Sequence, residues 1–215
     1  MTSSSRKPHE PSKADFTPGK PHSPLTKSDV RKIFYGLTLG MFLSALNQTI
    51  VVTALPTIGR DFGDFENLSW VIIAYLLSST VVSPLYGKLS DIHGRRAMML
   101  WAIGFFLVGS VISAAAPNMA VLIAGRTLQG IGGGGIVPLT QTTIADMVTP
   151  RERGHYQAYI GSSWIVAGLT GPALGGAIAD HLHWSVIFWL NVPFGILAAL
   201  LAYHAIWRRC SRIMR

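Results

Sequence analysis

Six long apolar runs dominate the sequence and limit the folds that are open to it. They cover residues 33–55, 70–87, 97–116, 119–145, 158–179 and 184–207. A hydrocarbon layer of about 30 Å takes about 20 residues of helix to cross, and each run supplies that number or nearly so. Arg126 is the one charged side chain well inside a run. Buried helices of a large soluble protein would need charged faces between them, so the runs predict six transmembrane helices.

The basic residues gather on one side of the predicted membrane. If the N-terminus is cytoplasmic, sixteen of the 18 lysines and arginines fall on the inner side, and Arg60 alone falls on the outer side. By the positive-inside rule this predicts a multi-pass protein of the plasma or bacterial inner membrane with both termini in the cytoplasm. The net charge of +8 forms no basic patch interleaved with aromatic residues, which argues against nucleic acid as a partner.

Composition predicts three parts. Residues 1–32 hold five prolines and many Ser, Lys and Thr residues, which predicts a disordered cytoplasmic tail. Residues 33–207 form the transmembrane domain, and residues 208–215 form a basic cytoplasmic tail. Cys210 is the only cysteine, so the chain can form neither an intramolecular disulfide nor a cysteine-based metal cage. We expect no metal and no cofactor.

A glycine-rich stretch, GRTLQGIGGGG at 125–135, admits two interpretations. Gly130, Gly132 and Gly135 fit the G-x-G-x-x-G spacing of dinucleotide-binding loops. Such a loop needs a strand before it and an acid about 20 residues on, whereas here an apolar helix precedes it and the next acid is Asp146. Glycines also let membrane helices approach closely. The stretch therefore predicts a crowded central helix.

Arg126 is the residue of this helix that is least favourable in a membrane, because placing a charge deep in the bilayer costs a free energy of roughly 2.5–3.5 kcal/mol or more. Either it snorkels to the outer interface, or it faces a water-filled cavity, which is the interpretation we favour. In a cavity it would bind anionic groups or act electrostatically on a proton site. The polar and aromatic residues expected at the same site are Asn47, Gln48, Tyr75, Gln129 and Trp164.

Two further segments carry a recognisable pattern. GKLSDIHGRR at 87–96 joins the second and third runs, either as a tight turn with internal ion pairing, such as Asp91 to Arg95, or as a solvated loop. Its start resembles residues 176–180, which lie 89 residues further on, and inverted three-helix repeats would give such an echo. In the fifth run Gly171, Pro172 and Gly175 lie on one stripe of a helix.

Several of these segments together resemble the major facilitator superfamily. GKLSDIHGRR resembles the signature loop of that family and matches it at Gly87, Leu89, Asp91, Gly94, Arg95 and Arg96. LIAGRTLQGIGGGG resembles the helix 4 motif at Arg126, Gln129 and Gly130, and GPALGG at 171–176 resembles the helix 5 motif of antiporters. LNQTIVVTALPTI and WSVIFWLNVPFG resemble the helix 1 and helix 6 signatures of the 14-helix drug:proton antiporter branch.

The resemblance implies an all-α membrane protein with six transmembrane helices in two inverted three-helix repeats, one half of a major facilitator fold. It also implies proton-coupled efflux of small organic, hydrophobic or drug-like compounds, and no enzymatic activity. The implied partners are the lipid bilayer, a small-molecule substrate, protons and a second six-helix half.

The resemblance further implies a role for each motif. Asp91 and Arg95, within the loop that also holds Gly87, Gly94 and Arg96, would help a cytoplasmic gate to open and close. Arg126 would take part in proton coupling. The helix 5 motif would favour export and limit leak, through Gly171, Pro172, Gly175 and Gly176.

The sequence departs from the family pattern at two points. Asn47 stands where that branch usually carries an aspartate, and an amide cannot titrate, so proton coupling there is in doubt. The chain also ends after the sixth run, which is one half of a family member. An alternative is therefore a truncated, non-transporting membrane subunit that pairs with or regulates a full-length transporter.

Overall fold

The described chain is entirely helical. The computed structural model describes residues 27–213, with the side chains of 34–200 except that of Pro150. Within 27–213 it contains no strand, which confirms the all-α prediction. Its helices are α1 (Lys27–Phe62), α2 (Leu68–His93), α3 (Arg95–Ala114), α4 (Met119–Met147), α5 (Pro150–His181) and α6 (Val186–Ile213).

The helices are long and apolar enough for a membrane. α1 to α5 each contain a stretch that meets the length and composition of a membrane span, and α6 contributes a shorter apolar stretch, Val186–Leu200, within the residues described. α1 extends beyond the predicted run 33–55 at both ends and passes through Pro56. Residues 1–26 of the predicted N-terminal tail lie outside the described residues, as do 214–215 of the C-terminal one.

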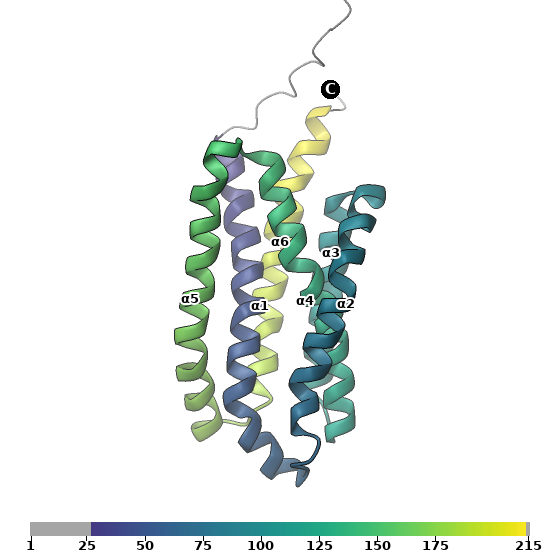
Figure 1. The fold of residues 1–215 in the computed structure, drawn as a ribbon, viewed down its shortest axis with the longest axis vertical. Helices are drawn as coiled ribbons and strands as arrows, with labels where there is room; N and C mark the ends of the chain where they lie inside the picture. Colours follow the sequence, from purple (N-terminus) through teal and green to yellow (C-terminus); the bar gives the residue numbers. More distant parts are fainter. Residues whose placement is uncertain (1–26, 214–215) are drawn as a thin grey trace, which may run out of the picture.

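The connections between helices are short and use residues suited to them. Gly63 and Gly94 adopt φ angles of +64° and +84°, a left-handed conformation that costs glycine little. Gly94 alone separates α2 from α3. Asn118 caps α4, since its side-chain oxygen accepts a hydrogen bond from the Val121 N–H at 3.0 Å,. Five successive reversals of chain direction place the α1–α2, α3–α4 and α5–α6 connections at one end of the bundle and the α2–α3 and α4–α5 connections at the other (Figure 1).

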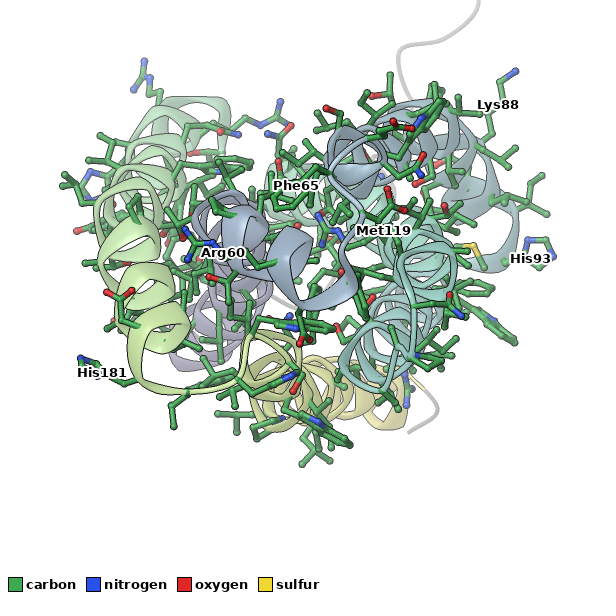
Figure 2. All side chains as sticks on the ribbon, turned by 90° about the horizontal axis from the view of Figure 1, so that it is seen from below. Arg60, Phe65, Lys88, His93, Met119 and His181 are labelled. Atoms are coloured by element: carbon green, nitrogen blue, oxygen red, sulfur yellow. The ribbon has the colours of Figure 1, made fainter. Side chains whose placement is uncertain are left out.

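The helix contacts follow a symmetric pattern. α1 packs against α5 and α6, α4 packs against α2 and α3, and α3 packs against α6. If α1, α2 and α3 are exchanged with α4, α5 and α6 in that order, the same helix pairs remain in contact. This is the symmetry expected of two three-helix repeats. Figure 1 shows α5 beside α1 on one side of the bundle and α2 beside α3 on the other, and Figure 2 shows the bundle end-on with side chains between the helices.

The glycines of α4 lie where neighbouring helices leave no room for a side chain. Gly130 and Gly134 lie so close to the backbone of α2 that a Cβ at either position would overlap it. Gly132 lies equally close to α3, at Ala102 and Phe106. Contacts on two sides of one helix confirm the prediction that this glycine-rich stretch packs α4 between its neighbours.

Candidate functional site

Arg126 is buried in the second turn of α4, with 1% of its surface exposed. Its Nε donates a hydrogen bond to the Val71 carbonyl at 3.1 Å, and one terminal nitrogen donates to Gln129 Oε1 at 2.6 Å. The guanidinium carbon lies 4.4 Å from the ring centroid of Tyr75, in a cation–π contact,. None of these described contacts is a carboxylate, so the charge is stabilised by dipoles and an aromatic face.

This placement differs from both interpretations of the sequence. The side chain neither reaches an interface nor faces open water, because Tyr75, Gln129 and the backbone of Val71 enclose its guanidinium. An arginine within an apolar run shows that burying it is costly, but it does not show which groups will contact it. Val71 and Tyr75 of α2 come within reach of Arg126 because the glycines of α4 allow α2 to approach closely.

A network of neutral polar side chains continues from Arg126 across the bundle. Gln129 Nε2 donates to Ser110 Oγ of α3 at 2.6 Å and to Asn47 Oδ1 of α1 at 3.3 Å. Asn191 of α6 donates its Nδ2 to the same Asn47 oxygen at 2.9 Å. All four side chains are buried. The network therefore links α1, α3, α4 and α6 at the position of the sequence-predicted residues Asn47 and Gln129.

Asn47 satisfies only half of its hydrogen-bonding groups. Its Oδ1 accepts two N–H donors, whereas its Nδ2 has no partner in the described part of the chain. A buried donor without a partner costs about 1–3 kcal/mol. An ionised aspartate at this position would keep both accepted hydrogen bonds and carry no unpaired N–H. The two hydrogen bonds that Asn47 accepts are thus ones that a carboxylate could also accept.

An open cavity of about 440 Å³ lies beside this network, between α1, α2 and α4. Gln48 and Tyr75, both singled out from the sequence, line it, and the Tyr75 hydroxyl contacts Ser44 Oγ at 3.2 Å. Trp164 lies on α5 with 39% of its surface exposed and does not line this cavity. The lining side chains are neutral throughout: Ser44, Gln48, Tyr75, Ser79, Thr80, Ser83, Pro84, Val137, Pro138 and Gln141, with Gly133 and Gly134.

The loop between α2 and α3 is held by an ion pair that the sequence did not suggest. Arg95 at the start of α3 lies 2.9 Å from Asp146 Oδ2 near the end of α4, and both side chains are partly exposed. Asp91 is exposed and lies on α2, beyond the break at Gly94. A cation at a helix N-terminus and an acid at a helix C-terminus both oppose the helix dipole. The pairing therefore joins two helices rather than stabilising either one.

The opposite end of the bundle carries a second polar contact between distant segments. Trp184 donates its Nε1–H to Asp61 Oδ2 at 2.8 Å, and His183 Nε2 lies 3.4 Å from the same oxygen. The buried Trp184 ring also packs edge-on against Phe62. These contacts tie the end of α1 to the connection between α5 and α6. Sequence reasoning had singled out none of these four residues as a contact.

The helix 5 motif lies against α1. A Cβ on Gly171 would overlap the Thr49 side chain, and a Cβ on Gly175 would overlap that of Thr53. Thr49 also donates a hydrogen bond to the Ala167 carbonyl of α5 at 3.1 Å. Gly176, in contrast, has no atom within 4 Å of a built Cβ. Two of the glycines in the motif therefore form a tight seam with α1.

The fold and this site define a class: a polytopic membrane protein whose helices line an open, uncharged cavity of mixed polar and apolar character beside a buried arginine. The sequence profile of the Major Facilitator Superfamily matches residues 37–212. The chain belongs to that superfamily. Six described helices with the contact symmetry above agree with this assignment.

Curated relatives, several of them named as efflux pumps, place the chain in the drug efflux branch of the superfamily. A transporter named as the "Acurin A biosynthesis cluster MFS-type transporter" of Aspergillus aculeatus is 46% identical over 161 residues, which cover 75% of this chain and 29% of the relative. "Multidrug resistance protein 3" of Bacillus subtilis is 38% identical over 172 residues, which cover 80% of this chain and 34% of the relative. This chain thus spans about a third of the length of these relatives.

Solved structures show the same fold. The xylose transporter XylE from E. coli superposes with a TM-score of 0.72 at 19% sequence identity, covering 81% of this chain and 48% of that one. The human organic anion transporter MFSD10 superposes with a TM-score of 0.66 at 24% identity, covering 81% and 47%. Each comparison matches about half of a solved transporter.

Proposed function

We propose that this chain forms the N-terminal six-helix half of a proton-coupled secondary transporter that exports small organic, drug-like compounds across a cell membrane. The open cavity between α1, α2 and α4, with the buried Arg126 network beside it, is the observation that carries the proposal. Relatives named as efflux pumps and multidrug resistance proteins support it. The proposal assigns the chain no enzymatic reaction.

The two ends of the bundle suggest how access to the cavity alternates. The Arg95–Asp146 pair is partly exposed, so it contributes only about 0–1 kcal/mol and breaks and forms at low cost. A contact of this strength suits a gate at the end that we assign to the cytoplasm. The seam of Gly171 and Gly175 against α1 leaves no room for a methyl group at either position, and such close packing would limit leak through this wall.

The orientation rests on the distribution of charge between the two ends. Arg95 and Arg153 lie at the end that holds the α2–α3 and α4–α5 connections, whereas Arg60 lies at the end of α1, on the opposite side of the bundle. The positive-inside rule then assigns the former end to the cytoplasm. The start of α1 and the end of α6 fall on that side, because the six described helices alternate in direction.

Proton coupling is a separate part of the proposal and needs its own test. Asn47 cannot take up a proton, and every acid between residues 34 and 200, Asp61 and Asp146 among them, lies near a helix end or in a connection. The buried positive charge of Arg126 would act on any proton that binds near the cavity. We therefore expect efflux to respond to a pH gradient and to lose that response when Arg126 is replaced.

The test is transport by the chain in sealed vesicles. An imposed pH gradient, acid inside inverted vesicles, should drive accumulation of a fluorescent organic dye, and collapse of the gradient by nigericin should abolish it. Arg126→Ala should abolish coupled accumulation, whereas Arg60→Ala, which removes an exposed arginine at the outer end, should leave it unchanged. Absence of accumulation together with a co-purifying transporter would instead support the alternative of a non-transporting subunit.

A further inference from the structure

We propose that the cavity wall formed by this chain selects uncharged organic compounds with hydrogen-bonding groups and discriminates against organic cations. The inference rests on the proposed function, since it takes the cavity between α1, α2 and α4 as the binding site for the transported compound. It assigns a chemical class to a site whose occupant the fold alone does not specify.

The lining chemistry is the first observation. Hydroxyl and amide groups line the cavity, and no described lining residue carries a charge. Gln48, Gln141 and Thr80 make no side-chain hydrogen bond to other described residues, so their donors and acceptors are left to water or a ligand. Ser79 donates its hydroxyl proton to the Leu76 carbonyl at 2.9 Å, which leaves its oxygen free to accept. Such a wall can satisfy a neutral polar compound but cannot neutralise a cation.

The buried arginine is the second observation. Arg126 has no carboxylate among its described contacts, so its positive charge is not cancelled locally. Tyr75 contacts this guanidinium and also lines the cavity, which places the charge close behind the cavity wall. Charges in a protein interact with an effective dielectric of about 20 rather than that of water, so a cation close to this wall is repelled more strongly than it would be in solution. This charge therefore opposes any cation in the cavity.

The occupied face of Tyr75 is the third observation. Aromatic faces are the neutral groups that bind organic cations best in proteins. One face of the Tyr75 ring is already covered by the Arg126 guanidinium, at 4.4 Å from the ring centroid. A second cation on the remaining face would share the ring with a like charge. The Tyr75 ring, which is the most favourable neutral partner for a cation in this wall, is thus already occupied by the Arg126 guanidinium.

The experiment compares two ligands that differ only in charge. A 7-methoxycoumarin with a tert-butyl substituent and its isostere with a trimethylammonium substituent are titrated, by fluorescence anisotropy, against the chain in nanodiscs of phosphatidylcholine. We expect the neutral compound to bind at least tenfold more tightly. Binding of the cation with equal or greater affinity would overturn the inference, as would failure of the neutral compound to bind.

A designed carboxylate supplies the matched variant. Gln48→Glu places an acid in the cavity wall and should raise the affinity for the cation at least tenfold, whereas Gln157→Glu places the same acid on an exposed position of α5, outside the cavity, and should leave it unchanged. Circular dichroism confirms that both variants fold. An equal response of the two variants would contradict the assignment of the cavity.

Transport of the same two compounds separates this inference from the proposed function. If the binding preference holds and vesicles accumulate neither compound, the inference stands and the transport proposal fails. If vesicles accumulate both compounds and the cation binds as tightly as the neutral one, the transport proposal stands and the inference fails.

Discussion

Replacement of Gly132 by alanine tests whether glycine is needed for the packing of α4. A methyl group at this position would overlap the backbone nitrogen of Phe106 and the carbonyl oxygen of Ala102 in α3. Backbone atoms cannot rotate aside as a side chain can, and carbon atoms pack at about 3.5–4.0 Å. The two helices would therefore have to separate by roughly 1 Å.

The expected loss of stability follows from two opposing terms. Overpacking costs about 1–3 kcal/mol, and we expect about 2–3 kcal/mol here because the overlapped atoms belong to the backbone. The better helix propensity of alanine returns up to about 1 kcal/mol. A net loss of about 1–2 kcal/mol corresponds to a fall in Tm of about 2–8 °C for a chain of this size. Circular dichroism during heating in detergent measures it.

Gly104→Ala is the matched control for this experiment. Gly104 lies on the partner helix α3, and a Cβ built there has no atom within 4 Å. Its replacement should leave Tm unchanged or raise it slightly. The packing argument would be refuted if Gly132→Ala melted at the same temperature as Gly104→Ala.

Three further substitutions test individual contacts through the same melting measurement. The double variant Arg95→Asp with Asp146→Arg should melt at or above the native temperature. The swapped charges keep the ion pair, and each now agrees with the dipole of its own helix. A lower Tm for the double variant than for both single variants would contradict this. Trp184→Phe keeps an aromatic ring but loses the N–H that Asp61 accepts, so it should cost about 1 kcal/mol, and an unchanged Tm would show the bond to be unimportant. Asn47→Asp removes an unpaired N–H and should raise Tm at about pH 8. The gain should be lost only at about pH 2, well below the usual carboxyl pKa of about 3.9, where the group is largely protonated; equal Tm values for native and variant at both pH values would count against the network as described.

The helices and their packing could be predicted because each signal is local in the sequence. An apolar run shows a span by its length, and a cluster of glycines such as Gly130, Gly132 and Gly134 shows that other backbones come close. The ends of the helices were less predictable. α1 continues through Pro56 to Phe62, since a proline in a membrane bundle does not end a helix as it would in water.

The ion pair of Arg95 could not be predicted from spacing. Asp91 and Arg95 are four residues apart, the spacing at which opposite charges meet on one helix. Gly94 lies between them with φ of +84°, so they belong to different helices and Arg95 pairs with Asp146 instead. The positive φ of one glycine thus removed the geometry on which the spacing argument depends.

The polar network could be predicted only in part, for a similar reason. Asn47 and Gln129 were recognisable as polar residues within apolar runs. Their partners Ser110 and Asn191 lie 19 residues from Gln129 and 144 residues from Asn47, and no local pattern specifies which distant side chains will meet. Trp164 shows the converse, since it was expected at the same site as Arg126 but lies on α5 outside the cavity.

The most direct test of the account is the side of the membrane on which each end of the bundle lies. Cys210, the only native cysteine, is replaced by serine, and His93→Cys and Glu66→Cys are made separately at exposed positions in the α2–α3 and α1–α2 connections. A membrane-impermeant maleimide should label the His93 variant only in inverted vesicles and the Glu66 variant only in right-side-out vesicles. Labelling of both variants from the same side would contradict a bundle that crosses the membrane with its basic end in the cytoplasm.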